Sequence, residues 1–155
     1  MACCGTQSAD KTNSPREAVC PVNGKTYKSV PRKTLLQHIK HPENQHISEQ
    51  GYYFCSSPEC DVVYFGDDGS AITRTDIREE VGQKQVGQQR MLCYCFDITE
   101  KMVYQEIQAH GYSPSYSFVV SQTKQENCAC ESRNPSGRCC LKDFPKAAKR
   151  KPSQQ

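Results

Sequence analysis

The stretch Tyr52-Tyr-Phe-Cys-Ser-Ser-Pro-Glu-Cys-Asp-Val-Val-Tyr-Phe65 carries two apolar runs, joined by a short segment with a cysteine at each end. Both runs consist of aromatic and β-branched residues, which favour strands. The proline in the joining segment favours a turn. The sequence therefore predicts two strands joined by a turn, with the thiols of Cys55 and Cys60 placed across it.

The segments around this hairpin continue the pattern of short strands and turns. Gly66-Asp-Asp-Gly69 predicts a tight turn, and residues 71–77 predict a third strand. Residues 34–39 include Leu35, Leu36 and Ile39, but the segment is too short to distinguish a helix from a strand. Residues 82–89 are rich in glycine, glutamine and lysine, which indicates a linker or a loop that crosses between two lobes.

An earlier cysteine and a histidine extend the hairpin cysteines into a candidate zinc site. Cys20 begins the segment Cys20-Pro-Val-Asn23, in which Asn23 stands where a C-x2-C knuckle would carry its second cysteine. Structural Zn²⁺ is usually held by four cysteine or histidine ligands. We therefore expect Cys20, Cys55 and Cys60 to bind zinc together. His38 is the predicted fourth ligand because it lies on the one apolar segment nearby.

A denser set of cysteines occupies the last two-fifths of the chain: Cys93-Tyr-Cys95, Cys128-Ala-Cys130 and Cys139-Cys140. The Cys-x-Cys pair allows two thiolates from one turn to bind one iron, and a second iron then needs two more sulfurs. All four later cysteines are candidates for those two positions. Six thiols could instead fill structural zinc sites, but the C-x2-4-C knuckles typical of zinc are absent here. The spacing therefore favours a [2Fe–2S] cluster.

A helical hairpin is predicted between the first and second of these cysteine pairs. Asp97 and Thr99 can each cap a helix that ends at Gly111. Two further short helices are predicted, at residues 115–127 and 141–148. The first helix would direct its N-terminal N–H groups at the thiolates, which stabilises the negative charge of a bound cluster.

The composition limits the compartment and the classes of function. The chain has 155 residues and 11 cysteines, an odd number that cannot pair completely in intramolecular disulfides. It has no apolar signal stretch and no run of about 20 apolar residues, so we expect a cytoplasmic protein without membrane insertion. The net charge of +3 does not favour nucleic acid as a partner. No nucleophile, general base or substrate pocket is legible, so we do not expect an enzyme.

Three segments of the chain resemble the N-terminal domain of CopZ-type copper chaperones: residues 52–65, Cys93-Tyr-Cys95, and Cys128-Ala-Cys-Glu-Ser-Arg-Asn-Pro-Ser-Gly-Arg-Cys-Cys-Leu141. The resemblance implies one Zn²⁺ and one [2Fe–2S] cluster, with copper bound at most transiently. The C-terminal half is also similar to bacterioferritin-associated ferredoxin, a helical cluster-binding module. The positions that match the cluster ligands are Cys93, Cys95, Cys128 and Cys139, with Cys130 and Cys140 as alternates, and Cys20, Cys55 and Cys60 match the zinc ligands.

The expected fold is therefore α+β, with a small β-rich zinc-binding lobe and a helical [2Fe–2S] lobe of the bacterioferritin-associated ferredoxin type. The expected divisions are a disordered N-terminus at 1–17, the zinc-binding lobe at 18–89, the cluster-binding lobe at 90–145 and a basic tail at 146–155.

The expected function is single-electron transfer in copper handling. Full copper chaperones of this type carry a further βαββαβ domain with a copper-binding Cys-x-x-Cys, which this sequence does not contain. We therefore expect the protein to assist the reduction of Cu(II) to Cu(I) for a separate copper carrier or a copper-transporting ATPase. The sequence does not identify the electron donor. The alternative is a structural zinc-binding module that mediates protein interaction without redox activity.

Overall fold

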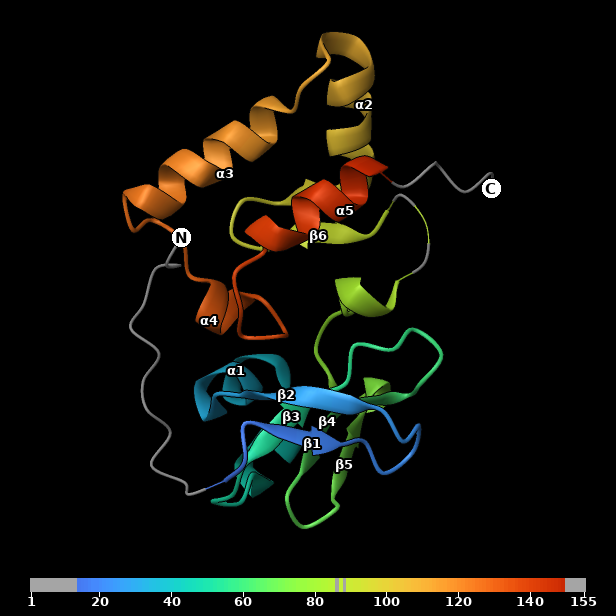
Figure 1. Cartoon of the computed structure of the whole chain (residues 1–155). Coiled ribbons are helices and arrows are strands. Elements are labelled where there is room, and N and C mark those ends of the chain that lie inside the picture. Colours follow the sequence, from blue (N-terminus) through green and yellow to red (C-terminus); the bar gives the residue numbers. More distant parts are fainter. Residues whose placement is uncertain (1–13, 86, 88, 150–155) are drawn as a thin grey trace.

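The computed structural model describes residues 14–85, 87 and 89–149. A sheet lobe and a helical lobe lie end to end, and the short helix α4 (Cys130–Arg133) lies between them (Figure 1). The sheet lobe has five antiparallel strands whose order in the sheet follows the sequence: β1 (Glu17–Val19), β2 (Thr26–Val30), β3 (Tyr52–Phe54), β4 (Val62–Gly66) and β5 (Ala71–Thr73).

Strands β3 and β4 are buried on both faces of the sheet. Successive side chains of a strand point to opposite faces, so one continuous apolar run can supply two cores. Phe54 and Tyr64 belong to the core that also contains Val30, Leu35 and Ile39. Tyr53 and Phe65 stack on the other face, with ring centroids 5.3 Å apart. The strands predicted at 52–54 and 62–65 are confirmed.

The third predicted strand is shorter than expected, and the segment at 34–39, which the sequence left undecided, is mainly helical. The third strand ends at Thr73 because residues 74–76 turn into the 3-10 helix η2 (Arg74–Asp76), where the Asp76 carboxylate accepts from the Thr73 backbone N–H. The undecided segment forms helix α1 (Arg32–His38). Its exposed and buried residues alternate in pairs, which matches the 3.6-residue period of a helix better than that of a strand. Two further 3-10 helices follow: η1 (Glu43–His46) and η3 (Gly82–Lys84).

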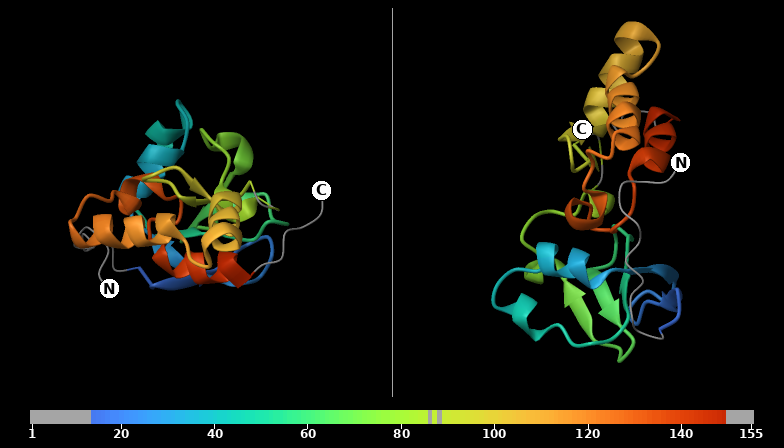
Figure 2. Two further views of the ribbon diagram at one scale, coloured as in Figure 1. Left: turned by 90° about the horizontal axis from the view of Figure 1, so that it is seen from above. Right: turned by 90° about the vertical axis from the view of Figure 1, so that its left-hand side faces the viewer.

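The helical lobe begins with a two-stranded ladder and is closed by three helices. Helices α2, α3 and α5 gather at the end of the molecule opposite the sheet (Figure 2). The elements are β6 (Met91–Cys93), β7 (Ile98–Thr99), α2 (Glu100–His110), α3 (Pro114–Lys124), η4 (Leu141–Asp143) and α5 (Phe144–Lys149). Their shared core contains Leu92, Ile98, Val103, Val119 and Phe144. None of the helices in the described part of the chain is long and apolar enough to cross a bilayer.

Helix α2 begins and ends at residues that the sequence identifies. Thr99 caps the N-terminus by accepting a hydrogen bond from the backbone N–H of Met102 at 3.3 Å. Gly111 ends the helix in the left-handed region at φ 78°, where glycine carries no steric penalty. Asp97, the other candidate cap, lies in the preceding turn instead, with φ 57°. The predicted extent of this helix is confirmed.

The segment that carries the later cysteines packs against the sheet lobe. The hydroxyl of Tyr64 donates to the carbonyl of Pro135 at 2.6 Å, and the hydroxyl of Thr34 donates to the carbonyl of Glu131 at 2.5 Å. Helix α4 packs on α1. The two lobes are therefore joined by more than the chain that connects them.

The predicted divisions of the chain overlap with ordered structure at both ends. Strand β1 begins at Glu17, inside the stretch 1–17 for which disorder is expected, and α5 extends into the predicted tail. Residues 1–13 and 150–155 of those two segments lie outside the described residues. The division between residues 89 and 90 stays a prediction.

Asp67 joins the start of the sheet lobe to the turn after β4. Its carboxylate accepts hydrogen bonds from Ser14 Oγ at 2.5 Å, Tyr53 Oη at 2.7 Å and Gly51 N at 2.9 Å. The hydrogen bonds from Ser14 and Tyr53 lower the pKa of Asp67 below its ordinary value of 3.8. A carboxyl group with a lowered folded pKa stabilises the fold above its unfolded pKa, and this stabilisation is lost as the pH falls through the folded pKa.

We therefore expect Asp67→Asn to lower the free energy of unfolding by about 1 kcal/mol, since the carboxylate is exposed to solvent. The difference from wild type, measured by urea unfolding of the zinc-loaded protein, should stay constant between about pH 7 and pH 5. Asp61→Asn is the matched control, because Asp61 is 85% exposed and makes only a 3.6 Å ion pair with Arg74. It should change stability by less than about 0.5 kcal/mol. A difference for Asp67→Asn that already fades at pH 6 would contradict this account.

Candidate metal centres

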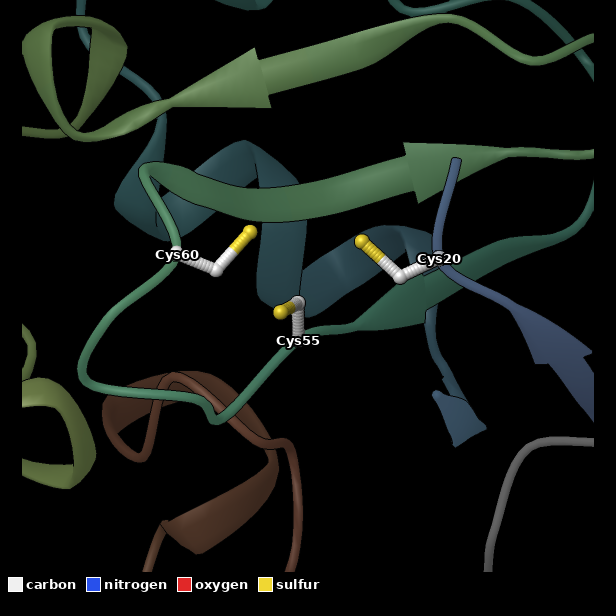
Figure 3. A group of neighbouring side chains, drawn as sticks. All are labelled: Cys20, Cys55 and Cys60. Atoms are coloured by element: carbon white, nitrogen blue, oxygen red, sulfur yellow. The ribbon is translucent and has the colours of Figure 1, made fainter. Parts of the chain in front are cut away.

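Three buried thiols converge at one end of the sheet. Cys20 follows β1, Cys55 follows β3 and Cys60 precedes β4. Their sulfur atoms all lie within 4.8 Å of one another and point to a common centre (Figure 3). Three buried sulfurs at this spacing fit a tetrahedral soft ion such as Zn²⁺, for which thiolate is a preferred ligand. The three cysteines predicted to share a zinc site are therefore brought together.

Local backbone geometry fixes each of these cysteines. The backbone N–H of Cys20 donates to the carbonyl of Lys25, and Gly24, at φ 74°, donates back to the carbonyl of Cys20. This closes a knuckle-like turn. Cys60 ends the proline-containing turn, with its N–H donating to the carbonyl of Ser57 at 3.3 Å. The thiols are thus held in place by turns whose backbone hydrogen bonds involve the cysteines themselves.

Polar groups around the three sulfurs stabilise thiolate at one of them. Burial opposes ionisation of Cys55, but hydrogen bonds from the Ser57 backbone and the Tyr27 hydroxyl, and the positive charge of Lys84, outweigh it and lower its pKa. Burial raises the pKa of Cys60. Asn23, at the place of the missing knuckle cysteine, donates from Nδ2 to Cys55 Sγ at 3.3 Å. The C-x2-C spacing marks only Asn23, so sequence reasoning missed Tyr27, Ser57 and Lys84.

His38 is not part of the three-thiol group. It ends helix α1, and burial of its ring lowers its pKa. Leu35 of helix α1 and the C-cap residue Ile39 pack on the sheet face that carries Phe54. The cysteines belong to the core on the opposite face. His38 was predicted as the fourth ligand because it lies near the cysteines in the sequence. The sequence does not show which face of the sheet the helix covers.

Four later cysteines form a second array in the helical lobe. Cys95 Sγ lies 3.8 Å from Cys130 Sγ. Cys93 interacts with both Cys95 and Cys140, and Cys140 also interacts with Cys130. Cys93, Cys130 and Cys140 are buried and Cys95 is partly exposed. The side chains thus close a ring of four thiols, in which each sulfur has two neighbours.

Interactions within the ring favour the thiolate form of Cys95 and the protonated form of its neighbour Cys130. Hydrogen bonds from Cys130 and Cys93 lower the pKa of Cys95 to about 3, and the backbone N–H of Ala129 also donates to its sulfur at 3.1 Å. At Cys130 a hydrogen bond with Cys140 lowers the pKa, but the hydrogen bond with Cys95 and burial outweigh it and raise the pKa to about 12. Hydrogen bonds with Cys130 and Cys93 raise the pKa of Cys140. Such an array shares protons in the absence of a cation, and a positively charged centre would replace them.

The two cysteines chosen first from the sequence are not members of this ring. Cys128 is partly exposed and acts electrostatically on Cys130, and Cys139 is disulfide-bonded. The two alternates occupy the ring instead, because α4 begins at Cys130 and the C-terminal helical segment follows directly after Cys140. A sequence signal for this exists: Cys140, like Cys95, lies just before a predicted helix.

The comparisons with known proteins agree with this architecture. Residues 17–78 match the family model described as the zinc binding domain of CopZ. The copper chaperone CopZ of Archaeoglobus fulgidus is 33% identical over 89 residues, which cover 57% of this chain and 42% of the chaperone. The chain thus spans less than half the length of that relative. The X-ray structure of the N-terminal domain of the same CopZ superposes with a TM-score of 0.68 at 28% identity, covering 83% of this chain and 96% of that domain.

The family match coincides with the part of the chain that contains Cys20, Cys55 and Cys60. The three buried thiols on short turns supply three of the four ligands that a structural zinc ion usually takes. Residues 17–78 are therefore similar to this zinc binding domain, and they contain three converging thiols that can bind a zinc ion.

Mutation can test whether zinc is bound by the three cysteines alone or by the cysteines together with His38. Cys20→Ser, Cys55→Ser and Cys60→Ser should each weaken zinc binding by at least about tenfold and lower the melting temperature, since metal binding contributes to folding. His38→Ala should leave zinc affinity within about twofold of wild type. Zinc affinity is measured by competition with a chromophoric chelator. Loss of zinc from His38→Ala with retention in Cys20→Ser would reverse the assignment.

Proposed function

We propose that this protein is an iron–sulfur and zinc-binding redox protein of copper handling, which transfers single electrons and assists the reduction of Cu(II) to Cu(I). The ring of Cys93, Cys95, Cys130 and Cys140 carries the proposal. Four thiolates are the ligand set of a [2Fe–2S] cluster. The zinc-binding domain supports the same assignment, since a domain of this type occurs in the N-terminal part of a copper chaperone.

The proposed cluster ligands are two pairs of cysteines from different segments. Cys93 and Cys95 come from one turn after β6, and Cys130 and Cys140 return after the α2–α3 hairpin. A cluster with two irons takes two thiolates at each iron, and the four cysteines of the ring supply that number. The N–H of Ala129 on Cys95 adds a donor of the kind that stabilises cluster charge.

A half-buried tyrosine holds the turn between Cys93 and Cys95. Tyr94 Oη accepts from the backbone N–H of Gly82 at 2.5 Å and donates to Gln83 Oε1 at 2.9 Å. Burial raises the pKa of Tyr94 to about 12, so its hydroxyl stays neutral at physiological pH. This contact ties the Cys-x-Cys turn to η3, at the edge of the sheet lobe. A fixed ligand geometry reduces the rearrangement that accompanies a change of redox state.

The proposed reaction moves one electron. Cys93, Cys95, Cys130 and Cys140 would hold a [2Fe–2S] cluster, which would supply the one electron that converts Cu(II) to Cu(I), without a proton or a further reactant. A separate copper carrier or a copper-transporting ATPase would receive the Cu(I). The proposed compartment is the reducing cytoplasm, where free thiols persist. The electron donor is a cellular reductant that has to be found biochemically.

Single Cys→Ser variants test the cluster ligands. Cys130→Ser and Cys140→Ser should lose most of the iron and the visible absorption of anaerobically purified protein, because each removes a thiolate from the ring. Cys128→Ser and Cys139→Ser are matched controls from the same segment and should keep both. The opposite pattern would restore Cys128 and Cys139 as ligands. Colourless wild-type protein that holds only zinc would favour the alternative, a structural zinc module that mediates protein interaction.

Electron transfer is tested with the reduced wild-type protein. Anaerobic addition of one equivalent of Cu(II) should restore the oxidised visible spectrum and produce one equivalent of Cu(I), read with a Cu(I)-specific chelator. Cys130→Ser, reduced and treated in the same way, controls for reduction of copper by free thiols. Reduced cluster that persists in the presence of Cu(II) would exclude this function.

A further inference from the structure

Lys84 places a buried positive charge against the zinc site. The side chain is 3% exposed, which is rare for lysine unless it is paired. It projects from η3, the segment between the two lobes, toward the proline-containing turn that carries Cys55 and Cys60. Nothing in the pattern of cysteines and histidines indicates this residue, since it lies in the polar stretch expected to be a linker.

The contacts of Lys84 match the donor capacity of an ammonium group. Its Nζ donates to the carbonyl of Ser57 at 2.7 Å and to the carbonyl of Cys60 at 2.8 Å. The third acceptor is Cys55 Sγ, at 3.9 Å. An ammonium has three N–H donors and no acceptor, so three acceptors satisfy it. The amine is thereby held over the turn and beside one of the three sulfurs.

The charge of the site explains why an ammonium is held there. Three thiolates around Zn²⁺ leave a net charge of −1 in a buried position. A buried charge without a partner is costly, and a partner with good hydrogen bonds offsets that cost. With Lys84 the three-thiolate site with Zn²⁺ becomes neutral. A fourth thiolate would return it to −1.

Asn23 occupies the sequence position at which a C-x2-C knuckle would carry a fourth cysteine. Its Nδ2 donates to Cys55 Sγ at 3.3 Å and to Tyr27 Oη at 2.9 Å, and its Oδ1 accepts from the backbone N–H of Lys25 at 2.9 Å. Both ends of the amide are engaged, with the donor end toward the sulfur. Asn23 thus adds no negative charge and stabilises the thiolate that Lys84 also approaches.

We propose that Lys84 is the built-in counter-charge of a three-thiolate zinc site, a positioning residue that replaces the electrostatic need for a fourth anionic ligand. It acts through the thiolates and does not bind the metal. The proposal rests on zinc binding by Cys20, Cys55 and Cys60 and is independent of the cluster.

The test compares zinc affinities of charge-removing variants with that of the wild-type protein. Lys84→Met keeps the length of the side chain and removes the charge, and should weaken zinc binding about 10- to 100-fold, the usual effect of losing a partner of the ligands. Lys33→Met, on the exposed side of α1, is the matched control and should stay within about twofold of wild type. The readout is competition with a chromophoric chelator at fixed pH, together with circular dichroism to confirm the fold.

A second variant keeps the test decisive if Lys84→Met fails to fold. Lys84→Gln retains N–H donors for the carbonyls of Ser57 and Cys60 but carries no charge, so it isolates the electrostatic contribution. It should also bind zinc at least about tenfold more weakly than wild type. A folded Lys84→Gln protein with wild-type affinity would overturn the proposal. Wild-type protein that binds no zinc would instead overturn the site itself.

Discussion

The convergence of three buried sulfurs at one end of the sheet is the constraint on which the sheet lobe depends. Cys20, Cys55 and Cys60 come from the ends of three different strands, so one ion between them fixes the relative positions of β1, β3 and β4. Only 35% of the chain is apolar, which leaves little area for a conventional core. A metal staple supplies stability that such a small core lacks. The stacked rings of Tyr53 and Phe65 pack in the same cluster as the sulfurs.

The sheet lobe in turn determines where the later cysteines lie. The segment between Cys130 and Cys140 follows the surface of the sheet lobe closely. At Gly137, with φ 68°, a Cβ atom would come within 2.8 Å of Thr34 Oγ1, so glycine is required for both backbone conformation and space. Hydrogen bonds such as that from Tyr64 to Pro135 hold the same segment. Contacts with the sheet lobe thus help to position Cys130 and Cys140, although the sheet lobe itself contributes no sulfur to the ring.

Segment η3, three residues long, contacts the surroundings of both thiol arrays. Lys84 is hydrogen-bonded beside the three-thiol site, and Gln83 contacts Tyr94 in the turn between Cys93 and Cys95. Gln83 also donates to Asn134 at 2.8 Å, in the segment that leads to Cys140. A stretch that resembles a plain polar linker in the sequence is therefore part of the structure around both arrays. Its role depends on contacts with residues that lie far away in sequence.

The sequence by itself determined the local elements and the set of cysteines from which the sites are built. Apolar runs with a turn between them specify β3 and β4, and Thr99 and Gly111 specify the ends of α2, because propensity and capping act over a few residues. Tertiary structure decided which thiols meet. It placed α1, which ends at His38, on the other face of the sheet, and it brought Cys130 and Cys140 together with Cys93 and Cys95. The metal ligands themselves stay a prediction. Spacing lists the available sulfurs, but packing between distant segments sets the distances between them.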